Sequence, residues 1–127
     1  MPSKIMQQIR ESATSPVVRK EEGWTGEFRF KSEFIGFAGH FPDNAVLPAV
    51  VQFSLAVFIV REIKENKFEP VRVQKAKFSS VLGPEMPIKA VVNIEKEEGP
   101  DMTVSCRISG PAETASSFKM DLAGSGE

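Results

Sequence analysis

The chain has 127 residues and a formal net charge of −1, with 41% hydrophobic and 26% charged residues. This length suits one domain with one hydrophobic core, and we expect residues 1–127 to form it. The near-neutral charge, without a basic stripe, argues against nucleic acid and a membrane surface as partners.

Cysteine and histidine usage excludes further classes of protein. The single cysteine, Cys106, excludes an internal disulfide and any multi-cysteine metal site, and together with the single histidine, His40, it argues against a dedicated zinc or iron site. We therefore expect no metal and no cofactor. Cys106 falls in an alternating run, which predicts a buried strand thiol. The apolar run at 50–60 is too short to span a bilayer, and the N-terminus lacks a signal peptide's apolar segment, so we expect a soluble, cytoplasmic protein.

The first part of the chain is predicted to contain a short helix and one strand. Residues 3–12 have the pattern of an amphipathic helix, and 12–17 read as a turn because Pro16 disfavours helix in the residue before it. Residues 24–34 are predicted to form a half-buried strand, since Trp24, Phe28 and Phe30 share one parity.

The middle of the chain combines a stiff loop with a long apolar helix. Residues 35–48 are rich in glycine and proline and contain His40. Pro48 is predicted to be the first helical residue, where its missing N–H costs nothing. The helix runs from about 48 to 65 and is apolar on nearly every face. Such a helix is buried on all sides, which requires a sheet wrapped around it.

Beyond Lys67 the periodicity changes to two. Strands are predicted at 71–78, 87–97, 101–109 and 113–122, with turns at 82–87, 97–101 and 110–113. One strand, one buried helix and a meander of about four strands make an α+β protein.

The segment around His40 resembles the 3-hydroxyacyl-[acyl-carrier-protein] dehydratases of fatty-acid synthesis. Their pattern, G-H-F-P-x-x-P-x-x-P-G-V followed by an acidic residue on the helix, is matched by Gly39, His40, Phe41, Pro42, Pro48 and Val50. Ala45 and Ala49 replace a proline and a glycine, and Ser54 stands at the acidic position. The form PAVVQFS, with Gln52, is also similar to a dehydratase-like branch associated with aryl-polyene pigments. The resemblance implies the hotdog fold, in which a curved antiparallel sheet wraps one long central helix.

The resemblance also implies roles for individual residues. His40 is the base that takes the α proton, because an imidazole titrates near neutrality. The backbone N–H groups of Ala49 and Val50 hold the thioester oxygen as it gains charge. Gly39, Phe41 and Pro48 complete the implied substrate-binding set.

The acid that protonates the leaving hydroxyl is the open point. Ser54 has a hydroxyl that forms hydrogen bonds but cannot deliver a proton as a carboxylic acid does, which predicts a slow enzyme or none. Asp43 and Glu85 are alternative carboxylates in this chain. A second chain is another source, because sites of this family lie at a dimer interface.

Three functions therefore remain open: a dehydratase, a degenerate protein that binds acyl thioesters without turnover, and a hotdog thioesterase. The resemblance implies an acyl thioester on acyl carrier protein or coenzyme A as substrate, and a homodimer or higher homo-oligomer. Basic residues between Arg61 and Lys77, with Lys64 and Lys67 among them, predict a basic patch near the site mouth that steers an acidic carrier protein. A solvated helix end is the alternative.

Overall fold

The computed structural model describes residues 3–37 and 46–124. Its elements are helix α1 (Ser3–Ser12), strands β1 (Val18–Lys20) and β2 (Gly23–Phe28), the short 3-10 helix η1 (Ile35–Phe37), helix α2 (Ala49–Lys64), and strands β3 (Glu69–Phe78), β4 (Ile88–Glu98), β5 (Asp101–Ser109) and β6 (Thr114–Ala123). Both helices and the last three strands begin and end within about one residue of the predicted positions.

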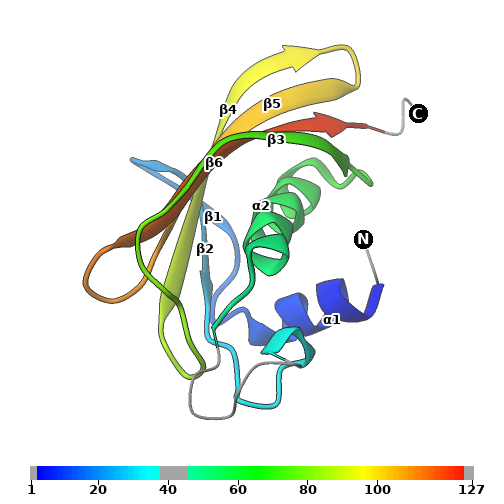
Figure 1. Ribbon diagram of the computed structural model, residues 1–127. Helices are drawn as coiled ribbons and strands as arrows, with labels where there is room; N and C mark the ends of the chain where they lie inside the picture. The colour runs from blue at the N-terminus through cyan, green and yellow to red at the C-terminus, as the bar shows by residue number, and fades with distance from the viewer. Residues whose placement is uncertain (1–2, 38–45, 125–127) are drawn as a thin grey trace.

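The strands of the described residues form one antiparallel sheet of six strands, in the order β1-β2-β4-β5-β6-β3. The sheet curves around α2, and α1 covers the side of α2 that the sheet leaves open (Figure 1). Ile9 of α1 is fully buried, and Arg10 pairs with Glu62 of α2 at 2.9 Å. This arrangement confirms the predicted α+β class and hotdog fold.

The apolar run of α2 forms the centre of the core. Leu55, Ala56, Val57, Ile59 and Val60 are fully buried, as expected of a helix that is apolar all round. Full burial of a leucine or isoleucine side chain stabilises the fold by about 1.5–3 kcal/mol. The helix ends at Glu65, which adopts the left-handed conformation (φ 50°).

The strand predicted at 24–34 is shorter than expected. β2 ends at Phe28, and Phe30 is fully buried beyond the end of the strand. Phe30 packs against Phe28 and Phe34, with ring centroids 6.3 and 4.5 Å away. The alternation of buried residues therefore extends past the end of β2, because Phe30 is buried in an aromatic cluster and not by pairing with a neighbouring strand.

The predicted meander of four strands is correct only for β4, β5 and β6. β3 pairs with β6 at the far edge, and β4 pairs with β2 instead of β3. The loop between β3 and β4 therefore carries the chain back across the sheet. β1 is a further strand that was not predicted, because its three residues are all exposed and show no alternation.

Among the residues that the structure describes, no helix is both long and apolar enough to cross a bilayer.

Candidate functional site

The start of α2 is the described part of the predicted site. Pro48 is the N-cap, with extended backbone angles (φ −66°, ψ 156°), so it precedes the first helical residue and is not that residue as predicted. Its carbonyl accepts hydrogen bonds from the N–H groups of Val51 and Gln52, both at 3.1 Å. The N–H groups of Ala49 and Val50 come before the first intrahelical donor and lie at the positive end of the helix dipole. Both residues are exposed, Val50 by 62%.

Gln52 holds the chain just before the helix. Its Nε2 donates to the Leu47 carbonyl at 3.0 Å, and its Oε1 accepts from the Ser116 hydroxyl on β6 at 2.6 Å. Both side chains are buried. The Leu47 N–H also donates to the Leu82 carbonyl at 2.7 Å. Leu47 is therefore fixed by both of its backbone polar groups, and Pro48 follows directly from this fixed point.

Sequence reasoning missed the role of Gln52. The available signal was a glutamine within an otherwise apolar helix, because a buried amide needs partners for both its ends. The identity of those partners depends on β6 and on the residue before Pro48, and no local pattern specifies them.

Ser54, the predicted replacement for the helix acid, is buried on α2. Its Oγ donates to the Val50 carbonyl at 2.8 Å, one turn earlier in the same helix. Serine often makes this bond within helices. At the position where the resemblance predicts the helix acid, this chain therefore has a hydroxyl that donates a hydrogen bond to the backbone.

Gly39, His40, Phe41 and Asp43 lie in the segment 38–45, outside the described residues. The described residues that flank this segment are held in the core. Phe37 is buried and packs edge-on against Phe34 with centroids 5.5 Å apart, while Leu47 is the fixed residue described above. The structure thus brings together Pro48, Ala49, Val50 and Ser54, and the assignment of the other site residues stays a prediction.

Glu85, the alternative carboxylate, lies in the loop between β3 and β4. Its side chain is exposed and lies 4.0 Å from the Arg29 guanidinium. Its backbone is bonded at both groups, because its N–H donates to the Phe30 carbonyl and its carbonyl accepts from Arg29 Nε. Glu85 therefore forms a loop-to-strand contact with Arg29.

The basic patch predicted near the site mouth is wrong for the α2 residues. Lys64 ends a helix of 16 residues that begins beside Pro48, so the two lie about 24 Å apart along its axis. Lys64 also pairs with Glu97 at 3.2 Å, and Arg61 pairs with Glu69 at 3.1 Å. These cations are at the opposite end of α2 and are largely neutralised, as in the solvated helix end that was the alternative.

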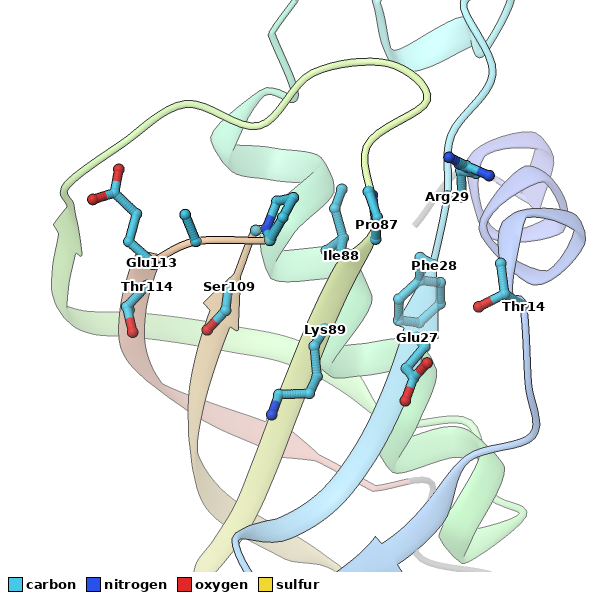
Figure 2. A pocket seen from close by; sticks show the side chains of 13 residues that line it. Thr14, Glu27, Phe28, Arg29, Pro87, Ile88, Lys89, Ser109, Glu113 and Thr114 are labelled. Atoms are coloured by element: carbon cyan, nitrogen blue, oxygen red, sulfur yellow. The ribbon is translucent and has the colours of Figure 1, made fainter.

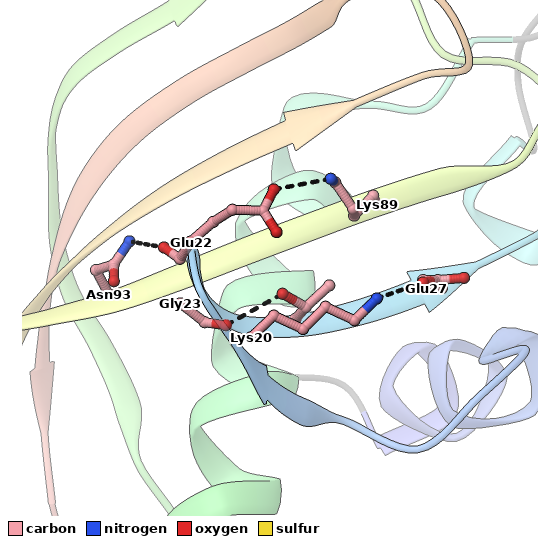
Figure 3. Close-up of polar contacts among 7 residues, drawn as sticks. Lys20, Glu22, Gly23, Glu27, Lys89 and Asn93 are labelled. Atoms are coloured by element: carbon pink, nitrogen blue, oxygen red, sulfur yellow. Dashed lines mark hydrogen bonds and ion pairs between the residues drawn. The ribbon is translucent and has the colours of Figure 1, made fainter.

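A cavity of about 690 Å³ lies away from α2, between the ends of β2 and β4 and the β5–β6 turn (Figure 2). Two of its charged residues, Glu27 and Lys89, form ion pairs. Lys89 pairs with Glu22 at 2.9 Å and lowers the pKa of that carboxyl, and Glu27 pairs with Lys20 at 3.3 Å (Figure 3). The pair of Lys20 with Glu27 joins β1 to β2, and the pair of Lys89 with Glu22 ties the turn of this hairpin to β4, which favours a structural role for these groups.

Cys106 lies in the core of β5, as predicted from its alternating run. Burial raises the pKa of its thiol far above the ordinary value. The thiolate is the reactive form of cysteine, so Cys106 is a packing residue and not a nucleophile.

Several solved structures share this fold. The dehydratase heterocomplex ApeI:P from Xenorhabdus doucetiae superposes with a TM-score of 0.72 at 18% identity, covering 87% of this chain and 96% of that chain. The PaaI protein of the phenylacetic acid degradation operon of E. coli gives 0.65 at 12% identity, with 95% and 93% covered. The smu.793 protein of Streptococcus mutans, bound to acetyl-CoA, gives 0.66 at 7% identity, with 88% and 89% covered.

A comparison with curated proteins gave no match. The family described as ApeI dehydratase, or ApeI-like, matches residues 16–119, which include β1 to β5 and most of β6. The matched region also includes the GHFP segment and the start of α2, which the sequence had singled out. This chain belongs to the ApeI-like dehydratase family.

Proposed function

We propose that the protein is a dehydratase of 3-hydroxyacyl thioesters carried on acyl carrier protein or coenzyme A. The exposed start of α2 supports this proposal best. There the backbone N–H groups of Ala49 and Val50 directly follow Pro48, and Gln52 holds the residue before Pro48 in place. Preorganised N–H groups of this kind stabilise the oxygen of a thioester as charge develops on it. His40 is the base, and Gly39, Phe41 and Pro48 line the substrate path.

The reaction needs three transfers. The imidazole of His40 takes the proton at C2, the electron pair forms the C2–C3 double bond, and the hydroxyl leaves C3 as water after gaining a proton from solvent or from the imidazolium just formed. Ser54 is a poor source of that proton, since an alcohol is a far weaker acid than a carboxylic acid and this one already donates to Val50. A missing general acid costs about 10²–10⁴-fold in rate, so we propose slow turnover.

The test compares turnover of short and medium 3-hydroxyacyl carrier-protein thioesters by wild type, His40→Ala, Ser54→Ala and Ser54→Glu. We expect His40→Ala to lower the rate by at least about 10²-fold and Ser54→Ala to leave it unchanged. An unchanged rate in His40→Ala would contradict the proposal.

Binding without turnover is the second candidate, favoured by the serine at the acid position. This second function is the correct one if wild type binds the thioester without converting it and Ser54→Glu gains dehydratase activity. Release of free thiol without dehydration would instead indicate a thioesterase.

We also propose that residues 1–127 form one domain and that the domain works as a homodimer. In the sheet that the described residues form, β3 is an edge strand of ten residues, and an edge strand presents one row of backbone groups that no neighbouring strand pairs. Three exposed apolar residues gather where β3 ends beside the start of α2, and we call them the edge patch: Val50, Phe78 and Val81. Phe78 contacts Phe53, which lies one turn after Val50, with centroids 6.1 Å apart. The neighbour ApeI:P is described as a dehydratase heterocomplex, which supports assembly with a second chain.

Replacing Phe78 with aspartate is expected to shift the protein from dimer to monomer, because a charge would be buried in the interface. Light scattering measures the mass. Val18→Asp is the matched control, since Val18 is an exposed apolar residue on the opposite edge strand. A wild-type monomer, or an equal effect of both variants, would refute the edge patch as the interface.

A further inference from the structure

The face of the sheet that points away from α2 carries a groove of about 470 Å³ with an unusual charge pattern. We call it the basic groove and define it by six of its lining residues: Lys75, Asn93, Ser105, Arg107, Ser117 and Lys119. Ser105 pairs across the strands with Lys119, and Arg107 pairs with Ser117. Their chain neighbours Cys106 and Phe118 are buried in the core, so these four residues face outward.

The basic groove has excess positive charge, because no carboxylate lines it. Lys119 forms an ion pair at 2.9 Å with Glu95, which lies beside the groove. Within the part of the chain that the structure describes, Lys75 and Arg107 form no close ion pair, but each acts on a carboxylate beside the groove. Lys119 lowers the pKa of Glu95, helped by a hydrogen bond from Ser105 and by the charge of Lys75, and Lys89 lowers the pKa of Glu22, helped by the charge of Arg107. The neighbouring groove along β6 shares Lys75 and Lys119 with the basic groove, but it is also lined by the carboxylates of Glu98, Asp101 and Asp121.

The backbone of β3 is distorted at Lys75, and this distortion places the Lys75 side chain in the basic groove. Gln74 pairs with Lys119 and Lys77 with Ser117, so Lys75 and Ala76 together oppose the single residue Phe118. This is a β-bulge, which changes the direction of a side chain. In a regular strand the residue after Gln74 would face α2, whereas Lys75 lines the outer groove. Lys75 also has a positive φ of 53°, a strained conformation for a residue with a side chain.

We propose that the basic groove is a binding site for a phosphate group. Arg107 and Lys75 supply charge, and the Ser117 hydroxyl supplies a hydrogen bond, as phosphate oxygens need. Asn93 Nδ2 already donates one N–H to the Glu22 carbonyl at 2.9 Å, so its second N–H is the one left for a phosphate oxygen. The site lies on the side of the sheet opposite α2, so it is independent of the thioester chemistry proposed above.

The test is a titration of the ¹⁵N-labelled protein with inorganic phosphate at low ionic strength, where screening is weak. We expect chemical-shift changes confined to the groove strands and a Kd in the millimolar range, typical of a shallow exposed site. Arg107→Gln and Lys75→Asn should each weaken binding about five- to tenfold. Asparagine is chosen at Lys75 because it tolerates a positive φ and removes the charge.

The control is Lys96→Gln, which removes an equal charge from the neighbouring groove, where Lys96 pairs with Glu98 at 3.2 Å. We expect less than about a twofold change in Kd, since Lys96 does not line the basic groove and is already paired with Glu98. Absence of shifts in the groove, or equal weakening by all three variants, would overturn the proposal. A parallel titration with adenosine 3′,5′-bisphosphate distinguishes the source of the phosphate. Tighter binding than phosphate assigns the site to nucleotides, and equal binding assigns it to the phosphate group alone.

Discussion

Gln52→Leu is expected to lower the free energy of unfolding by about 2–4 kcal/mol, because it leaves two buried polar groups without their partner. These are the Leu47 carbonyl and the Ser116 hydroxyl, which in the wild-type protein form hydrogen bonds with the two ends of the Gln52 amide. Leucine fills a similar volume, so little of the loss comes from a cavity. Urea unfolding followed by circular dichroism measures the change.

Ser116→Ala is the matched control for this effect. It removes only one of the two bonds and leaves Gln52 bonded to Leu47, so we expect a loss of about 1 kcal/mol. In the double variant the two losses should not add, because both act on the same network. A Gln52→Leu protein within about 0.5 kcal/mol of wild type would show that Leu47 is held by its bond to Leu82 alone.

Phe28→Ala is expected to lower the free energy of unfolding by about 3–5 kcal/mol, since a buried aromatic residue is replaced by a cavity. Phe28 is almost fully buried on β2, and its ring contacts Phe30 and Phe58, the latter edge-on at 5.9 Å. It therefore joins the end of the strand to the middle of α2. Chemical denaturation at several protein concentrations measures this loss.

Phe78→Ala provides the comparison for Phe28, as Phe78 is 47% exposed at the β3 edge. In a dimer its effect should grow with protein concentration, whereas the Phe28 loss should not depend on concentration. Comparable losses at low protein concentration would contradict the core role assigned to Phe28.

The elements with strong local patterns were predicted well. α2 is one long apolar run between Pro48 and a polar end, and β4 to β6 alternate between clear turns, so their bounds needed no tertiary information. β1 was missed because its pairing with β2 depends on the tight turn at Gly23 (φ 142°), where a side chain would collide with Asn93. The partner of β3 is not encoded locally, because β6 is distant in the sequence.

The same distinction applies to the candidate site. A short motif predicted the start of α2 and the amides of Ala49 and Val50, and the structure places these residues at the exposed helix end. The roles of Gln52 and Lys75 could not be predicted in this way. The first depends on where Ser116 lies, and the second on a bulge whose position is set by the register between two strands.

The strand order has a consequence for how the protein folds during synthesis. Glu69 pairs with Ala123 and Phe78 with Ser116, so β3 leaves the ribosome long before its partner β6. Until then the part of the sheet that covers the start of α2 is incomplete, because Phe53 of this helix packs against Phe78 of β3 and Phe118 of β6. Long-range pairing of this kind slows folding and exposes hydrophobic surface. The nascent chain is therefore expected to need protection from aggregation until β6 has emerged and closed the sheet.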